Sequence, residues 1–238
     1  MIKAVIFDVG GTIIWKNGKR YLKANAWTAS NYLRSLGHEF NYKEFSDRLE
    51  SLQKDSPKAG DNLEQLNTTK EHISSLCKEF HIPLNPNLLN DITKAFFMPE
   101  IAGAIALPEI KKVLAVLKGK VKLAILSNTR SHILIVEILK QLGLDGFDII
   151  ATSARAGYRK PSPHFFRAVI DNWDFKPQEI VMIGDLPHKD VVGAKALGLK
   201  SIWINIDSDA KDDFAADAIA TSPKDILTIL ESWGLNLN

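Results

Sequence analysis

The chain has 238 residues, of which 45% are hydrophobic and 24% are charged, an ordinary composition for a globular protein that can hold one large domain or two small ones. A formal net charge of +2 is too small to indicate a nucleic-acid partner. The single cysteine, Cys77, excludes an internal disulfide framework. Because no run of about 18 apolar residues is present and the N-terminus begins with strand residues, we expect no membrane span, no signal peptide and a cytoplasmic location.

The first predicted element is a buried strand that ends at a carboxylate. Apolar residues run from Ala4 to Phe7, and Asp8, two glycines and Thr12 follow. This pattern is typical of a parallel strand that ends in a tight loop, where open α/β sheets bind ligands. An aspartate there can act as a nucleophile or a metal ligand, and the glycines let backbone amides approach an anion. A simple turn cap is the alternative interpretation.

The next segment has a helical pattern. Helices are predicted at 21–36, 42–52, 62–80 and 87–97, and no convincing strand lies between them. We therefore predict that residues 16–106 form an all-helical domain inserted after the first strand.

Strands alternate with helices in the rest of the chain. Strands are predicted at 121–126, 147–152, 180–183 and 201–204, and helices at 109–117, 131–142, 162–173, 189–197 and 223–233. This alternation predicts a parallel, doubly wound sheet. Residues 1–15 and 107–238 are therefore expected to form a three-layer α/β core.

Four loops after predicted strands carry polar side chains. They hold Asp8, Ser127 with Asn128, Lys160, and Asp185 with Asp190. Because the carboxyl ends of parallel strands share one sheet edge, these side chains are expected to meet there. Three carboxylates would repel one another, and a divalent cation together with Lys160 would balance them. Oxygen ligands without His or Cys favour Mg²⁺ over Zn²⁺, and an aspartate beside Mg²⁺ fits phosphoryl transfer through an aspartyl-phosphate.

These loops resemble the four motifs of the haloacid dehalogenase (HAD) superfamily of aspartate-nucleophile phosphohydrolases. The matching segments, in the family's order, are FDVGGT at 7–12, LSN at 126–128, KPSP at 160–163 and GDLPHKD at 184–190. The resemblance covers residues 1–15 and about 107–210. The helical insertion resembles the family's helical cap domain.

The resemblance implies roles for the residues of the phosphoryl site. Asp8 would attack phosphorus, and Lys160 would stabilise the nucleophile and the transferring group. Ser127 and Asn128 would hold the phosphoryl oxygens together with the backbone that follows Asp8. The implied phosphate-binding residues are Gly10, Gly11, Thr12, Ser127, Asn128 and Lys160.

The resemblance also implies a metal site. Asp8, Asp185 and the backbone carbonyl of Gly10 would bind Mg²⁺. Asp190 would belong to the same site and orient the surroundings of the metal, through Lys160 or water.

One position departs from the family pattern. Phosphatases of this family usually carry a second aspartate two residues after the nucleophile, which protonates the leaving group and then activates water. That position is Gly10 here, and loss of a general acid–base group typically costs about 10²- to 10⁴-fold in rate. Three explanations remain open: substrates with good leaving groups, a proton from a cap residue or water, or loss of turnover.

A basic run begins at the predicted insertion. Lys16, Lys19, Arg20 and Lys23 could attract anionic substrates toward the site. An ordinary solvated surface is the simpler interpretation.

We predict a Mg²⁺-dependent phosphatase that acts on a small phosphorylated metabolite. The alternatives are a dehalogenase- or phosphonatase-like hydrolase, which also lacks the second aspartate, and a catalytically weak HAD-fold protein that binds a phosphorylated ligand or a partner. The first loop also resembles that of actin-like sugar kinases, but no second copy of it is present. No nucleic-acid or membrane partner is predicted, and no feature of the sequence predicts an oligomeric state.

Overall fold

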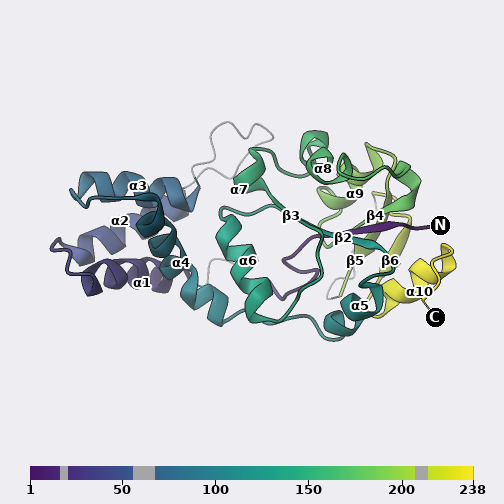
Figure 1. Cartoon of the computed structure of the whole chain (residues 1–238), viewed down its shortest axis with the longest axis horizontal. Helices are drawn as coiled ribbons and strands as arrows, with labels where there is room; N and C mark the ends of the chain where they lie inside the picture. Colours follow the sequence, from purple (N-terminus) through teal and green to yellow (C-terminus); the bar gives the residue numbers. More distant parts are fainter. Residues whose placement is uncertain (17–20, 56–67, 207–213, 238) are drawn as a thin grey trace. The chain divides into compact units, whose positions relative to one another are not determined.

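The computed structural model (Figure 1) describes residues 1–16, 21–55, 68–206 and 214–237. Contacts divide the chain into two compact units. The first unit comprises Met1–Lys16, Ile105–Thr129 and Leu142–Asn238, and the second comprises Asn17–Ala104 and Arg130–Gln141. None of the helices in the described part of the chain has both the length and the apolar character that crossing a membrane requires.

A six-stranded parallel sheet forms the first unit, with strand order β3-β2-β1-β4-β5-β6. The strands are β1 (Ala4–Phe7), β2 (Lys122–Ser127), β3 (Ile149–Thr152), β4 (Ile180–Gly184), β5 (Lys200–Ile204) and β6 (Ala218–Ala220). Phe7, the last residue of β1, pairs with Ile125 of β2 and Ile183 of β4. β4 continues one residue beyond this level, to Gly184, and β2 continues two, to Ser127, so the loops after the three strands start close together at one edge of the sheet.

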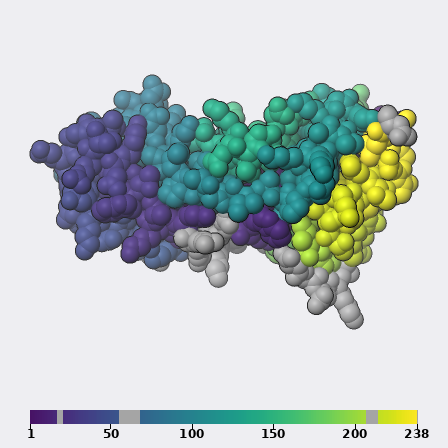
Figure 2. Space-filling view, turned by 90° about the horizontal axis from the view of Figure 1, so that it is seen from below, coloured from purple at the N-terminus to yellow at the C-terminus, as the bar shows by residue number. Residues whose placement is uncertain are grey.

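Helices cover both faces of this sheet. They are α5 (Ile110–Leu117), α7 (Ser153–Ala156), α8 (Pro163–Ile170), α9 (Asp190–Lys195) and α10 (Asp225–Ser232), with a short 3₁₀ helix at Pro177–Glu179. Figure 1 shows α8 and α9 on one side of the sheet and α5 and α10 on the other. In Figure 2 the C-terminal residues, in yellow, lie on the outer surface of this unit. The arrangement confirms the predicted α/β fold class.

One face of the sheet shows why these residues form strands. Alternate residues, such as Ala4 and Ile6 of β1, are fully buried in a cluster with Phe165 and Phe166 of α8. Successive strand side chains point to opposite faces, so the remaining residues of β1, which are also buried, face the other helix layer. Burial on both faces explains the continuous apolar runs in the sequence.

The second unit, in its described part, consists of helices. They are α1 (Leu22–Ser35), α2 (Tyr42–Asp55), α3 (Thr69–Glu79), α4 (Pro86–Ala102) and α6 (His132–Gln141). A capping box at Thr68 starts α3, and the Asn85 side chain, which accepts from the Leu88 amide, starts α4.

The structure differs from the sequence predictions at several elements. The helix predicted to stop before Pro99 continues to Ala102, because proline removes a single amide donor and one further turn can still form. The helix predicted at 131–142 appears as α6 but packs against α4 and is grouped with the helical unit. β6 and α7 are too short for a recognisable pattern. Residues 62–67 of a predicted helix lie outside the described residues, and the division into core and cap stays a prediction.

The packing of α8 on α9 yields a stability prediction. Phe166 is fully buried, and its ring lies so close to Gly193 that a Cβ on that glycine would be 2.2 Å from Phe166 Cε2. Phe166→Ala is expected to lower the free energy of unfolding by about 3–5 kcal/mol, measured by urea denaturation. Val192→Ala on the same helix pair, at a side chain 40% exposed, should change it by less than about 0.5 kcal/mol. Similar losses in both variants would contradict this packing.

Candidate active site

Asp8 lies directly after β1 at the centre of the sheet. Its amide donates to the Ile183 carbonyl at 2.9 Å, so pairing of β1 with β4 fixes its backbone. The residue is 8% exposed. Gly11 in the following loop has φ +83°, and a Cβ there would lie 2.4 Å from Asp185 Oδ2. Only glycine therefore suits this position, both for its backbone conformation and for the space beside Asp185.

Lys160 connects two of the predicted carboxylates. Its Nζ lies 2.7 Å from Asp8 Oδ1 and 2.7 Å from Asp190 Oδ1, and the residue is 2% exposed. Burial by itself lowers the pKa of the Lys160 ammonium, but the charges of Asp190 and Asp8 outweigh it, so the pKa lies above its ordinary value. The side chain is therefore a cation held between two carboxylates.

Asn128 positions the backbone of Lys160. The Lys160 amide donates to Asn128 Oδ1 at 2.8 Å, and Asn128 Nδ2 donates to the Lys160 carbonyl at 3.0 Å. This paired contact joins the loop after β2 to the loop between α7 and α8. The role of Asn128 in holding phosphoryl oxygens, which the resemblance implies, stays a prediction.

Asp190 starts α9 and is almost fully buried. Its Oδ2 accepts a hydrogen bond from the Leu186 amide at 3.0 Å, which closes the loop that follows β4. A Cβ at Gly184 would lie 2.2 Å from Asp190 Cγ, so the glycine makes room for this carboxylate. Burial raises the pKa of Asp190 above its ordinary value, although the Lys160 charge opposes this shift.

Asp185 follows β4 directly. Its carbonyl accepts from the indole Nε1 of Trp203 on β5 at 3.2 Å, a contact that the sequence does not predict. One carboxylate oxygen, Oδ1, is buried and has no hydrogen-bond partner among the described residues, and the Lys16 ammonium contacts the other, Oδ2. Burial raises the pKa of Asp185 to about 6, and the Asp8 charge adds to the shift while Lys16 opposes it.

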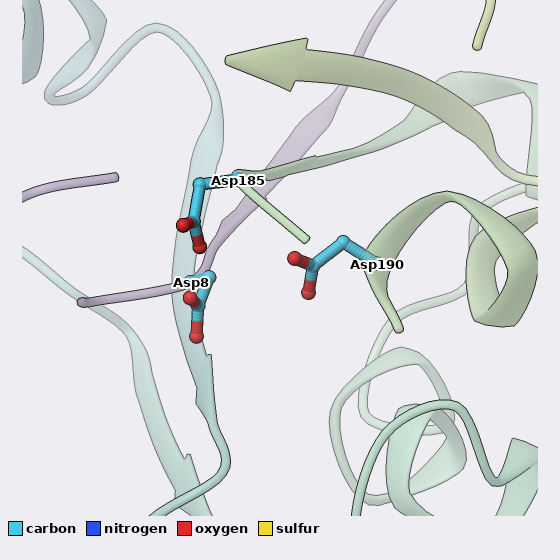
Figure 3. A group of neighbouring side chains, drawn as sticks. All are labelled: Asp8, Asp185 and Asp190. Carbon is cyan, nitrogen blue, oxygen red and sulfur yellow. The ribbon is translucent and has the colours of Figure 1, made fainter. Parts of the chain in front are cut away.

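The three carboxylates form one cluster. Ligand atoms of Asp8, Asp185 and Asp190 all lie within 4.8 Å of one another. Figure 3 shows Asp8 beside Asp185, with Asp190 facing them from the start of α9. The donors are oxygens, and the buried Asp185 Oδ1 lacks a partner among the described residues, so the cluster fits a hard divalent cation.

The other predicted phosphate-binding residues line the same loops. Ser127, the last residue of β2, is buried, and Thr12 is fully buried with an Oγ1 that has no partner in the described part of the chain. The Gly11 amide donates to the Ile14 carbonyl at 2.7 Å and the Thr12 amide to the Val9 carbonyl at 3.2 Å. A phosphoryl group would have to compete with these loop hydrogen bonds, so the roles of both amides stay predictions.

Gly10 does not need to be glycine. Its φ is not positive, and a Cβ built on it would meet only Lys16 Cγ, at 4.0 Å. A Cβ at this position therefore has room and causes no backbone strain. Neither the backbone conformation nor the nearest neighbours of a Cβ impose glycine at this position.

Lys16 is a site residue whose contact the sequence does not predict. It stands out in the sequence only as the start of a basic run, of which Lys19 and Arg20 lie outside the described residues and Lys23 is exposed. Its contact with Asp185 depends on how the chain turns back after the Asp8 loop, which has no signal in the residue pattern.

A pocket of about 380 Å³ lies beside this contact within the first unit. Its lining residues are Gly11, Trp15, Lys16, Leu107, Asp185, Ile204, Asn205 and Ile206. The wall is mixed in character: Trp15, Leu107, Ile204 and Ile206 are apolar, Asn205 is polar, and Lys16 and Asp185 are charged.

Comparison with known proteins identifies related sequences. A family model described as haloacid dehalogenase-like hydrolase matches residues 2–198. Glyceraldehyde 3-phosphate phosphatase from Pyrococcus furiosus is 32% identical over 91 residues, which are 37% of this chain and 38% of that protein. This chain therefore matches well under half the length of that relative.

Solved structures share the fold. A HAD phosphatase from Thermococcus onnurineus is 24% identical, with a TM-score of 0.65 over 100% of both chains. A 2-haloacid dehalogenase from Pseudomonas syringae is 21% identical, with a TM-score of 0.66 over 98% of this chain and 100% of that chain. At these identities the likeness concerns the fold, which phosphatases and dehalogenases have in common.

The raised pKa of Asp185 predicts how stability depends on pH. Asp185→Asn is expected to raise the melting temperature by roughly a few °C at pH 7.5 in EDTA, because it removes a buried negative charge. The folded-state pKa of about 6 exceeds the unfolded value of about 3.9. At pH values between these two pKa values, folding therefore takes up protons. The wild type loses stability relative to the variant as the pH rises from the lower value to the higher one. At pH 4 the difference should nearly vanish.

Asp148→Asn is a control variant for which the opposite change in stability is expected. The Lys122 side chain, whose Nζ lies 2.7 Å from Asp148 Oδ1, lowers the pKa of Asp148. The charged form is therefore favoured in the folded state, and this variant should be less stable than the wild type at pH 7.5. Thermal scans at both pH values, monitored by circular dichroism, test the pair. An Asp185→Asn variant that is destabilised at pH 7.5 would contradict the assignment.

Proposed function

The chain belongs to the family of haloacid dehalogenase-like hydrolases, and on that basis we propose that it is a Mg²⁺-dependent phosphatase of a small phosphorylated metabolite. The proposal depends chiefly on the Asp8 carboxylate, which contacts the buried Lys160 ammonium and belongs to the cluster with Asp185 and Asp190. A carboxylate held beside a fixed cation and two further carboxylates suits nucleophilic attack on a phosphoryl group. The phosphatase name of the Pyrococcus furiosus relative supports this reaction class.

The proposed reaction begins at Asp8. A carboxylate oxygen of Asp8 attacks phosphorus, the bond between phosphorus and the leaving oxygen breaks, and an aspartyl-phosphate forms. Water then attacks this phosphorus and releases inorganic phosphate together with the free carboxylate. Lys160, whose pKa is raised by Asp190 and Asp8 against the effect of burial, stays protonated and stabilises negative charge on the transferring group.

A divalent cation would be held by Asp8, Asp185 and Asp190, with the Gly10 carbonyl as the further ligand that the resemblance implies. When bound, it would supply positive charge that neutralises the phosphoryl oxygens. Mg²⁺ is the proposed ion because the donors are hard oxygens.

Gly10 restricts the proposed substrates. It has no side chain that could protonate the departing oxygen, so that oxygen leaves without help from this position. Acyl phosphates and aryl phosphates, whose leaving groups are stable anions, need little such help. We therefore propose that these activated esters are converted faster than alkyl phosphates such as sugar phosphates.

The reaction class is tested by release of phosphate from acetyl phosphate and p-nitrophenyl phosphate. Release is expected with MgCl₂, should stop in EDTA, and should fall by at least about 10³-fold in Asp8→Asn, because the amide is a poor nucleophile. Asp145→Asn, at an exposed carboxylate outside the site, is the matched control and should retain activity. Full activity of Asp8→Asn, or halide release from 2-haloacids without phosphate release, would contradict the proposal.

Gly10→Asp tests the missing acid directly. Because a Cβ at this position has room and the backbone is not in the glycine-only region, this variant is expected to fold and to hydrolyse alkyl phosphates roughly 10²-fold faster or more. Gly10→Asn has the same shape without a transferable proton and should give no comparable gain. Steady-state rates of the two variants, compared on one sugar phosphate, decide the question: equal rates would show that an acid at this position does not limit turnover.

A further inference from the structure

The Lys16 side chain crosses the loop that follows Asp8. Its Cγ lies 4.0 Å from the place of a Cβ on Gly10, and its Cε lies 2.9 Å from the place of a Cβ on Gly11. The path of this lysine thus runs over two residues without side chains. At its end the ammonium contacts Asp185 Oδ2.

This contact adds a second cation to the carboxylate cluster. Lys160 lies between Asp8 and Asp190, and Lys16 meets the remaining carboxylate, Asp185. The two lysines differ in their surroundings, because the Lys160 side chain is 1% exposed while the Lys16 side chain is 51% exposed. Lys160 is therefore a fixed part of the site, whereas Lys16 can leave Asp185 at little desolvation cost.

We propose that Lys16 is an intramolecular competitor of the divalent cation at Asp185. The inference rests on the proposed function, in which a cation binds this cluster. The Lys16 ammonium already contacts Asp185 Oδ2, and its positive charge would repel a metal ion that approaches the same carboxylate. A cation held by Oδ1 alone would be repelled as well, because both positive charges would lie at the same carboxylate.

The structure offers Lys16 a place to move. The pocket of about 380 Å³ is lined by Lys16 itself, Asp185 and Asn205, among others. A displaced ammonium would remain in a solvent-accessible space with polar partners. Cation binding would therefore be coupled to movement of one side chain, and the affinity would be lower than the three carboxylates alone would give.

Isothermal titration of the intact chain with MgCl₂ tests this competition without measuring turnover. Lys16→Gln keeps most of the side-chain length and removes the charge, and it is expected to bind Mg²⁺ about tenfold more tightly or better. Lys16→Ala should shift the affinity in the same direction. Lys16→Arg keeps the charge and should stay close to the wild type.

Lys122→Gln is the matched control. The Lys122 side chain is 52% exposed and also pairs with an aspartate, Asp148, but at the start of β2, away from the carboxyl ends of the strands. The substitution changes the net charge by the same amount and should leave Mg²⁺ affinity unchanged. Circular dichroism and melting temperatures establish that each variant is folded.

The outcomes separate this inference from the proposed function. If the wild type binds Mg²⁺, and Lys16→Gln and Lys16→Ala bind it with the same affinity as the wild type, the proposed competition is overturned. The phosphatase proposal would then stay intact. Weaker binding in these variants would also overturn it and make Lys16 a positioning residue for Asp185. Absence of Mg²⁺ binding in the wild type and in all Lys16 variants would overturn both the inference and the metal dependence of the proposed function.

Discussion

The buried Lys160 ammonium, held between Asp8 and Asp190, is the interaction on which the rest of the site depends. A charge that is 98% or more removed from solvent is stable only when opposite charges meet it closely, and both carboxylates lie at 2.7 Å. These residues follow β3, β1 and β4, so the ion pairs require the sheet order in which β1 lies between β2 and β4. The fold and the charge balance of the site therefore support each other.

Two glycines and a pair of hydrogen bonds to the backbone support this arrangement. Gly184 leaves room for Asp190, Gly11 leaves room for Asp185, and Asn128 fixes the Lys160 backbone through two hydrogen bonds. The Gly11 and Asn128 contacts join loops that are distant in the sequence, whereas Gly184 and Asp190 flank the single loop after β4. The site is thus held by the edge of the sheet, and its electrostatics follow from how deeply each carboxylate is buried.

Gly10 and Lys16 determine which side chains and charges the loop after Asp8 places beside the carboxylate cluster. Gly10 has no side chain, although a Cβ there would have room, and the Lys16 side chain passes beside it to reach Asp185. Apart from Asp8, the loop therefore brings a positive group and no further carboxylate beside the cluster. In the proposed function, this arrangement limits the supply of protons to a leaving group and weakens the attraction for a cation.

The sequence by itself determined the α/β class, most strands and the membership in a hydrolase family, because hydrophobic runs and loop motifs are local patterns. It also named every residue of the carboxylate cluster, since parallel strands end at one edge. Only the tertiary structure decided that Lys16 meets Asp185 and that Asn128 meets the Lys160 backbone. It also decided that α6 packs with α4 and that Ala218–Ala220 forms a sixth strand. These features depend on packing between segments that are far apart in the chain. Local periodicity in the sequence does not predict such packing.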